Sequence, residues 1–275
     1  MNQSFLNNKL FVLLTAIIAV PIVVIAVLSF VSTNGTNQAF SLDGFREIFS
    51  PLRLSELLKI AVRALIVCTI ATAISFFVAY LLVHNTSKYF QLFFFILITL
   101  PFLANESVRV FSWQYLLSEN GLFNQILSSI SGRQVSFFNG TNIANVYLVM
   151  IITCIPFGLF INAASLRTIP NIYWKAADDL NLNSFNKFWK IALPLSKFAI
   201  IASLLVTFFI SFSLSSEVNF LGGDSKISLR NLILSLMSAS KFQSIFSLGF
   251  LITILLMAFM FLLKEFNGKK ISYSK

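Results

Sequence analysis

The chain has 275 residues, of which 57% are hydrophobic and 11% are charged. A soluble globular domain carries about 25% charged residues, so this composition excludes an ordinary soluble enzyme. The many large apolar residues also exclude an intrinsically disordered chain, which needs low hydrophobicity. The net charge of +10 does not form a long basic run, because no run of Lys and Arg exceeds two residues. We therefore expect these charges to flank membrane helices, and we expect no nucleic-acid partner.

Six uncharged apolar stretches follow one another along the chain. Each is long enough, or nearly so, to cross a bilayer, which takes about 20 helical residues. Helix is the form that satisfies every backbone group within one span, so the sequence predicts an all-α membrane protein with six transmembrane helices in a single domain, 1–275. Pro101, near the end of the third stretch, predicts a kink or a break there. The predicted spans are 10–31, 64–83, 89–105, 146–166, 198–216 and 244–263.

The basic residues predict the orientation, because cytoplasmic loops of membrane proteins are enriched in Lys and Arg. With both termini in the cytoplasm, the inside segments hold 11 basic and three acidic residues, whereas the longer outside segments hold nine basic and seven acidic residues. We therefore expect both termini to be cytoplasmic, with short helices along the outer face in the long outside segments. The inside basic residues are Lys9, Lys88, Arg167, Lys175, Lys187, Lys190, Lys197, Lys264, Lys269, Lys270 and Lys275.

The segment Arg167–Lys197, between the fourth and fifth spans, is the most informative loop. Pro170 suits the first turn of a helix. Ile172, Ala176 and Leu180 then recur at i, i+4 and i+8, which gives that helix one apolar face. Such a helix is too apolar to stay uncovered, so we expect it to dock into another protein. The alternative is a helix that lies on lipid headgroups, which the nearby basic residues also favour.

Asn181 is predicted to end this helix, because Asn is the best residue after Gly for a left-handed C-cap. A second helical stretch follows with Phe185, Phe188 and Trp189. It leads to Pro194, where we expect the chain to re-enter the membrane.

This segment resembles the EAA loop of bacterial ABC importer permeases, whose pattern is E-A-A-x3-G-x9-I-x-L-P. All the spacings agree, but Lys175 replaces the Glu and Asn181 replaces the Gly. The resemblance implies an EAA-type cytoplasmic coupling loop, 167–197, that docks on a partner ATP-binding-cassette ATPase. Asp178 and Asp179 either pair with basic groups of that partner or solvate the helix. The positions assigned to docking are Lys175, Ala176, Ala177, Asp178, Asp179, Leu180, Asn181, Ile191, Leu193 and Pro194.

A second stretch resembles the spermidine/putrescine type of these permeases. Pro101, Asn105, Arg109 and Trp113 reproduce the P-F-x-x-N-x-x-x-R-x-x-x-W spacing that follows the third span, and Gly222-Gly223 after the fifth span is similar too. The resemblance implies a polyamine or similar small solute as cargo. It also implies ATPase subunits, a second permease subunit and an extracytoplasmic solute-binding protein as partners, in the bacterial inner membrane together with its lipid.

The sequence contains no G-x-x-x-x-G-K-[ST] loop, so we expect a partner subunit to bind and use the ATP. The single His84 and the isolated Cys68 and Cys154 offer no metal-binding spacing. We therefore expect no catalytic residue, no metal and no cofactor in this chain. These observations indicate a transport subunit that works by alternating access, and not an enzyme.

Polar residues at membrane depth are costly and are usually functional. A polycationic cargo needs negative charge along its path, because an unpaired charge in low-dielectric surroundings is costly. Glu106 and Arg109 are three residues apart and can pair on one helical face, which leaves Glu217 as the better candidate for that charge. Asn219 stands where the family often has an acid. The candidate substrate path is Asn105, Glu106, Arg109, Trp113, Asn162, Glu217 and Asn219.

Two other functions remain open on the sequence alone. A secondary transporter or channel would move solute without a partner ATPase, and it predicts internal symmetry or broken helices around a midplane site. A membrane scaffold without transport activity would not need the spacing of the docking loop. Genes for an ATPase and a secreted binding protein beside this one would favour the importer.

Overall fold

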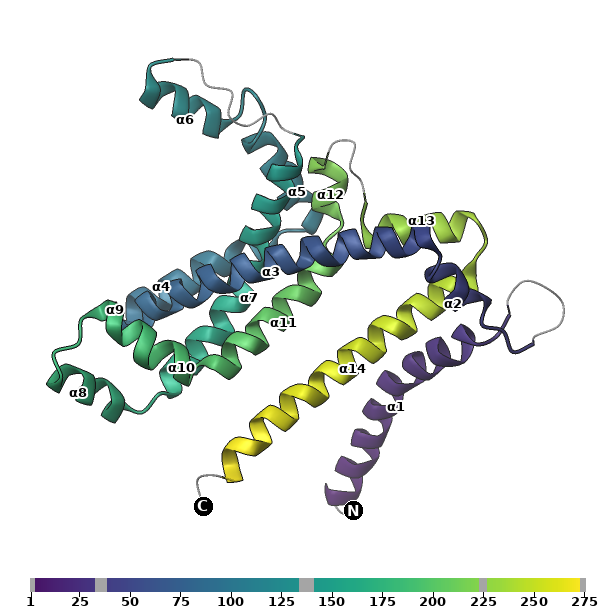
Figure 1. Cartoon of the computed structure of the whole chain (residues 1–275), viewed down its shortest axis with the longest axis horizontal. Helices are drawn as coiled ribbons and strands as arrows, with labels where there is room; N and C mark the ends of the chain where they lie inside the picture. Colours follow the sequence, from purple (N-terminus) through teal and green to yellow (C-terminus); the bar gives the residue numbers. More distant parts are fainter. Residues whose placement is uncertain (1–2, 33–38, 134–140, 223–226, 273–275) are drawn as a thin grey trace. The chain divides into compact units, whose positions relative to one another are not determined.

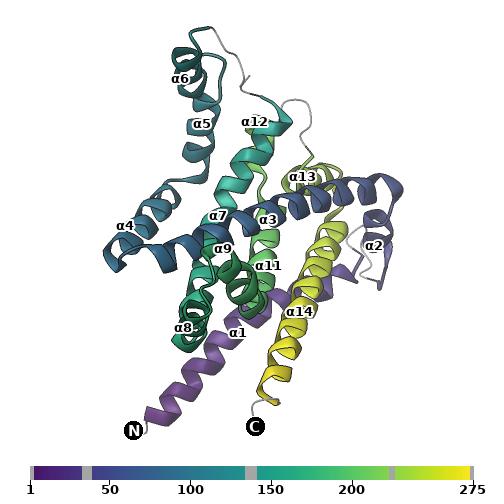
Figure 2. The same cartoon turned by 60° about the vertical axis from the view of Figure 1, so that its left-hand side comes forward.

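The structure is a computed structural model that describes residues 3–32, 39–133, 141–222 and 227–272. In these ranges the regular secondary structure is helical, apart from one isolated antiparallel bridge between Val31 and Phe40. The predicted all-α class is therefore confirmed (Figures 1 and 2). The helices are α1 (Gln3–Ser29), α2 (Asp43–Ile48), α3 (Pro51–Asn85), α4 (Lys88–Thr99), a 3-10 turn (Leu100–Leu103), α5 (Glu106–Leu116), α6 (Leu122–Ser131), α7 (Ile143–Thr168), α8 (Asn171–Asp179), α9 (Ser184–Lys187), a π-helical turn (Phe188–Ala192), α10 (Leu193–Leu195), α11 (Lys197–Ser213), α12 (Ser216–Leu221), α13 (Leu229–Ser238) and α14 (Phe242–Ser272).

The chain divides into two compact units, which are described separately. One unit comprises residues 1–57 with 231–275, and the other comprises residues 58–230. The divisions fall within α3 and α13. Every residue that the sequence analysis assigned to docking or to the substrate path belongs to the second unit.

Three helices are long and apolar enough to cross a membrane: Pro51–His84, Ile143–Arg167 and Phe242–Phe261. The bent pair Ser184–Leu195 and Lys197–Ser213 makes a fourth span if its two parts are counted together. These helices correspond to the predicted second, fourth, sixth and fifth spans. Among the described residues the structure therefore supplies three to four candidate spans, and the full count of six stays a prediction.

The start of α3 differs from the predicted start of the second span, and the end of α4 defines the predicted break in the third. α3 begins at Pro51, well before the predicted start at Ala64, because proline suits a first helical turn and nothing afterwards breaks the helix. The predicted break near Pro101 is confirmed: α4 is only 12 residues long and ends at Thr99, where the 3-10 turn follows. The third predicted span is thus shorter than expected.

The first unit is organised around α14, which packs against α1 and α2. The ring centroid of Phe30 lies 5.2 Å from that of Phe45 and 5.5 Å from that of Phe250. The side-chain amide of Gln243 donates hydrogen bonds to the backbone carbonyls of Ser29 at 3.3 Å and Ser41 at 2.8 Å. These bonds fix the end of α1 on α14, because a buried carbonyl needs a donor.

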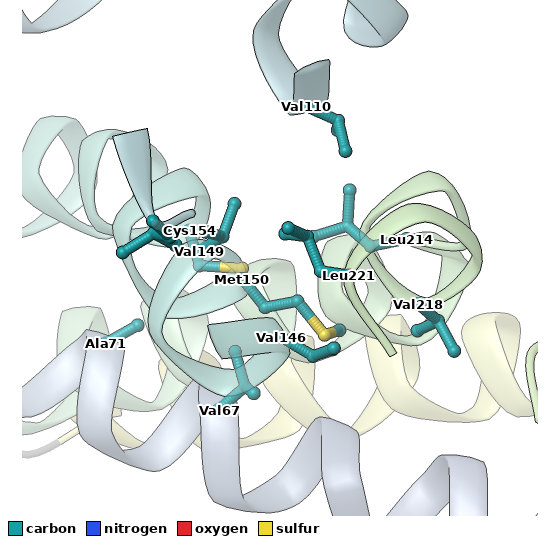
Figure 3. Packing of buried hydrophobic residues seen from close by; sticks show 11 residues of the cluster. Val67, Ala71, Val110, Val146, Val149, Met150, Cys154, Leu214, Val218 and Leu221 are labelled. Atoms are coloured by element: carbon teal, nitrogen blue, oxygen red, sulfur yellow. The ribbon is translucent and has the colours of Figure 1, made fainter. Parts of the chain in front are cut away.

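In the second unit, α7 contributes to two apolar clusters. The first cluster, shown in Figure 3, joins α7 to α3, α5 and the region where α11 leads into α12. The second joins α7 to the other end of α3 and to the π-helical turn. Both overall views show α8–α10 at one end of α7 and α11, and α5 with α12 at the other end (Figures 1 and 2). The first cluster consists of Val67, Ala71, Val110, Leu117, Val146, Val149, Met150, Cys154, Leu214, Val218 and Leu221.

Polar side chains tie α3, α7 and α11 together. Asn162 of α7 is fully buried, and its amide group donates to the hydroxyls of Ser75 on α3 at 3.2 Å and Ser203 on α11 at 3.3 Å. One turn away, the hydroxyls of Thr72 and Thr207 lie 3.1 Å apart. Small residues and hydrogen bonds of this kind hold helices together in membranes, where lipid is as apolar as the helix surface.

Gly158 of α7 sits at the closest point of this contact. A Cβ atom there would lie 2.4 Å from Ser75 Oγ and 2.9 Å from Ser203 Oγ. We expect Gly158→Ala to destabilise the purified protein by about 1–3 kcal/mol, as overpacking does. Thermal unfolding in detergent measures the effect. The matched control is Gly249→Ala in α14, where the added Cβ meets Ile25 Cγ2 at an ordinary 3.5 Å. Equal melting temperatures for the two variants would contradict the tight contact.

Candidate functional site

α8 ends in a hydrogen-bonded cap at the residue where the sequence predicted it. Asn181 has a φ of +50°, in the left-handed region. Its N–H donates to the carbonyl of Asp178 at 2.9 Å, and the N–H of Leu182 donates to the carbonyl of Ala177 at 3.0 Å. These two bonds form a Schellman motif. The predicted left-handed cap is confirmed, and it explains how Asn can occupy the position of the family's Gly.

The side chains of α8 divide into a packed set and an exposed set. Ala177 is 2% exposed and Trp174 is half-buried, whereas Ile172 and Leu180 are each 72% exposed. The ring centroid of Trp174 lies 3.9 Å from that of His84 in the last turn of α3. The predicted apolar stripe of α8 therefore faces away from the chain, and the opposite side of the helix holds it in place.

The 167–197 segment is anchored on the same end of α3 by a second aromatic contact. The Tyr80 hydroxyl donates to the backbone carbonyl of Ser184 at 2.9 Å. The ring of Phe188 lies 5.1 Å from that of Tyr80 and 5.5 Å from that of Phe76, between centroids. Aromatic pairs at such distances stabilise by about 0.5–1.5 kcal/mol beyond the area they bury.

The remaining residues predicted to dock are distributed over both faces. Asp178 forms an ion pair with Lys187 of α9, so its carboxylate is used within the chain. Ile191 is buried, Leu193 is half-buried, and Pro194 is exposed in α10. The exposed members on α8 and its end are Lys175, Ala176, Asp178, Asp179, Leu180 and Asn181.

A bend of 75° separates the Ser184–Leu195 stretch from α11. It falls at Ser196, whose φ of −95° and ψ of 7° leave the helical region. Pro194 lacks a backbone donor, which weakens the helix just before this point. The two stretches are therefore separate rods joined at one residue (Figure 1).

At the opposite end of α7 and α11, Arg109 of α5 and Glu217 of α12 form an ion pair with 3.7 Å between Nη2 and Oε1. The Glu217 side chain is completely buried and that of Arg109 is 13% exposed. Burial raises the pKa of the Glu217 carboxyl and Glu106 adds to the rise, while the backbone N–H of Glu217 and the Arg109 charge oppose it. The charged form of Glu217 is therefore favoured by Arg109 against the cost of burial.

At the start of α5, Glu106 is not the residue that forms the ion pair shown for Arg109. The structure shows Arg109 in an ion pair with Glu217. The i, i+3 spacing had suggested Glu106 as the partner, but tertiary packing brings the carboxylate of Glu217 to Arg109. Glu106 is exposed in the first turn of α5, where a negative charge suits the helix dipole. Asn105 is the N-cap, and its Oδ1 accepts from the N–H of Ser107 at 2.9 Å.

The other residues predicted for the path are not all brought together. Asn162 belongs to the packing contact between α3, α7 and α11 described above. Asn219 is half-buried in α12. Gly223, the second residue of the Gly-Gly pair, lies outside the described residues. The structure thus unites Arg109 with Glu217 and places Asn162 in a separate contact.

A cavity of about 200 Å³ opens beside Arg109. Its walls come from α4, the 3-10 turn, α5 and α7, and they are apolar apart from Arg109 and Thr153. Trp113, another residue predicted for the path, lines the cavity and stacks on Phe123 with 6.3 Å between ring centroids. The cavity can therefore hold a small, mainly apolar group next to one charged side chain.

The aromatic anchor made by Tyr80 and Trp174 was not predicted from the sequence. The available signal was the position of Trp174, two residues after Ile172, which puts the two side chains on different sides of a helix. An aromatic residue opposite an apolar stripe indicates that the helix is packed on one side and open on the other.

A family model described as the binding-protein-dependent transport system inner membrane component matches residues 71–273. The chain belongs to this family. It is 26% identical to the spermidine/putrescine transport system permease protein PotB of Haemophilus influenzae over 94% of this chain and 95% of that protein. It is 24% identical to PotB of Escherichia coli over 71% of each chain.

Solved structures share the fold. One is the crystal structure of a bacterial ABC transporter involved in the import of the acidic polysaccharide alginate, with a TM-score of 0.65, 14% identity and coverage of 98% of this chain and 99% of that one. Another is the bacterial alginate ABC transporter in complex with an alginate pentasaccharide-bound periplasmic protein, with the same TM-score and identity over 94% and 92% of the chains.

The family confirms the resemblance read from the sequence and makes the chain an inner membrane component of an ABC transporter, with several apolar helices able to span the membrane. The relatives are transport permeases and not enzymes.

The Arg109–Glu217 pair can be tested by a double-mutant cycle. Removing one partner of a buried pair costs about 3–5 kcal/mol, because the other charge is left poorly compensated. We expect Arg109→Gln and Glu217→Gln each to lower the stability of the purified protein, and the double variant to lose less than the sum, with a coupling energy on the order of 0.5–3 kcal/mol. Glu119→Gln, at an exposed position after α5, is the control and should be neutral. Additive losses would show that the two side chains act independently.

Proposed function

We propose that this chain is a membrane-spanning permease subunit of an ABC importer, and that it moves a small solute inward by alternating access driven by a partner ATPase. In this proposal the whole chain forms one transmembrane domain of six helices, with both termini and the 167–197 segment in the cytoplasm. Family membership and the excess of basic residues on that side support it.

The exposed stripe of α8 is the observation that carries the docking part of the proposal. Ile172 and Leu180 are 72% exposed, although Ala177 is buried and Trp174 packs against His84 on the other side of α8. Large apolar side chains on one face of a fixed helix are typical of a helix that binds in a groove of another protein. We infer that this stripe, together with the exposed Lys175, binds the ATPase subunit.

The anchoring of α8 supports a mechanical role. Closure of the ATPase subunits moves α8 as a rigid body, since the Schellman motif and the Trp174–His84 contact fix its end and its inner face. The motion passes to α3 through the aromatic contacts and to α11 across the 75° bend, and the helices rock between outward-open and inward-open states. ATP is bound by the partner, because this chain has no phosphate-binding loop.

Further subunits complete the proposed importer: a second permease subunit beside this one, and an extracytoplasmic solute-binding protein. The alginate transporter of similar fold, solved with its periplasmic protein, supports the second of these by analogy. We propose that α5 and α12, at the end opposite α8, lie on the side that receives solute from it.

Charged substitutions on the stripe test the docking. We expect the double variant Ile172→Asp/Leu180→Asp to reduce recovery of the ATPase subunit in co-purification by at least roughly tenfold, because buried apolar anchors dominate protein interfaces. The chain should still insert, since both positions are exposed. Ile130→Asp in α6, at a residue that is 80% exposed, is the matched control and should leave recovery unchanged. Full recovery with the double variant would exclude this stripe as the docking surface. Ala177 is a poor test position, because its burial means that a large substitution disturbs the chain itself.

We propose a polyamine or a similar small cationic solute as the cargo, which the similarity to the PotB proteins of spermidine/putrescine transport systems supports. Glu217, which the sequence analysis favoured as the compensating charge, is enclosed with Arg109 and suits the fixing of α5 on α12. Glu106 is exposed in the first turn of α5, three residues before Arg109, so we propose that it attracts the cation first.

Uptake of radiolabelled spermidine and putrescine tests the cargo in a strain that lacks other polyamine importers. We expect Glu106→Gln to lower uptake several-fold, because the change keeps the shape and removes the charge. Glu119→Gln removes one charge from another exposed position of the same outside segment, and it should transport normally. No uptake by the complete wild-type complex would rule out a polyamine cargo and leave the importer proposal standing.

A further inference from the structure

A second cavity, of about 500 Å³, lies where α3 turns into α4 and α7 ends. It is lined by Val83, Lys88, Gln91, Leu92, Phe95 and Arg167. We propose that this cavity binds the anionic phosphate headgroup of a membrane phospholipid. The proposal rests on the proposed orientation, which puts this end of the helices at the cytoplasmic membrane surface.

The cavity brings together two cationic side chains that have no acidic partner among the described residues. Lys88 is the first residue of α4, and Arg167 is in the last turn of α7. In the ranges that the structure describes, neither forms an ion pair, whereas Lys187 and Lys241 elsewhere in the chain do. Two neighbouring cations that stay unpaired in a cavity provide a site for a phosphate group.

The Arg167 side chain is already held in place. Its Nη2 donates to Oε1 of Gln91 at 2.7 Å, and the Gln91 amide donates in turn to the backbone carbonyl of Thr86 at 3.2 Å. The guanidinium carbon lies 5.5 Å from the ring centroid of Phe95. Gln91 is only 8% exposed, so its side chain is fixed by the fold. A guanidinium fixed in this way loses little freedom when it binds an anion.

The apolar walls favour a lipid over a free anion or an acidic protein segment. Val83, Leu92 and Phe95 line the same cavity, and Leu92 is 60% exposed on α4. A phospholipid matches both parts, since its phosphate meets Lys88 and Arg167 while its glycerol and acyl chains follow the apolar side. A free phosphate would use only the cationic part.

Lipid retention by the purified complex tests the site. The complex would be exchanged into nanodiscs with equal parts of phosphatidylglycerol and phosphatidylcholine, and the lipid retained after extraction would be counted by native mass spectrometry. We expect the wild type to retain phosphatidylglycerol preferentially. The Lys88→Gln/Arg167→Gln variant should lose this preference by roughly tenfold or more, because each basic residue near a membrane surface contributes about fivefold in affinity.

Two matched variants separate a site from general charge. Lys190→Gln/Lys197→Gln removes the same charge from exposed positions of the 167–197 segment, and it should keep the preference. Arg167→Lys keeps the charge and should retain most of the binding. Equal retention by the wild type and by Lys88→Gln/Arg167→Gln would overturn the proposal, as would an equal loss in Lys190→Gln/Lys197→Gln.

Two further measurements exclude the other occupants. If millimolar inorganic phosphate displaces the retained lipid completely, the site is one for a free anion and the lipid proposal is wrong.

ATPase recovery is measured on the same samples. If Lys88→Gln/Arg167→Gln loses the ATPase and keeps the lipid preference, these cations bind the partner and the lipid proposal is wrong. A loss of lipid preference with full ATPase recovery supports the lipid site. If the wild-type chain retains phosphatidylglycerol preferentially but recovers no ATPase subunit, the lipid site is supported and the proposed importer function is contradicted.

Discussion

The close contact of α3, α7 and α11 is the constraint on which the second unit depends. In hydrocarbon, helices gain nothing by covering apolar surface, so their association relies on close approach and on hydrogen bonds between them. Gly158 permits the approach, and Asn162 spans from Ser75 to Ser203. The two ends of α7 and α11 carry the two candidate functional regions, so both regions are attached to helices that this contact holds together.

The two regions differ in how they use polar groups. At the α5–α12 end, a buried carboxylate is matched to a guanidinium and fixes two short helices on the apolar cluster of Figure 3. At the α8 end, the chain uses aromatic rings on one side of a capped helix and leaves apolar side chains open on the other. The first arrangement suits a fixed structure, and the second suits a surface that awaits a partner.

Local signals in the sequence predicted the helical class, the break at Pro101 and the left-handed cap at Asn181, because each depends on the conformation of a few neighbouring residues. The partner of Arg109 could not be predicted in this way. Glu106 is close to Arg109 in sequence. Glu217 follows Arg109 by 108 positions, and the packing of α12 against α5 brings the two side chains together. The contact that Asn162 makes between helices could not be predicted for the same reason, since a polar residue in an apolar run is equally typical of a substrate path and of a contact between helices. Its partners Ser75 and Ser203 become visible only when three helices are assembled.

The bend at Ser196 has a mechanical consequence. The Ser184–Leu195 stretch and α11 meet at 75°, which is close to a right angle. Most of a displacement along the axis of the first helix would therefore become a sideways displacement of the second. A push directed along the Ser184–Leu195 stretch would therefore swing the near end of α11 across its own axis instead of sliding it lengthwise. Lengthwise sliding of α11, in contrast, would have to break the hydrogen bonds that join Thr207 to α3 and Ser203 to α7.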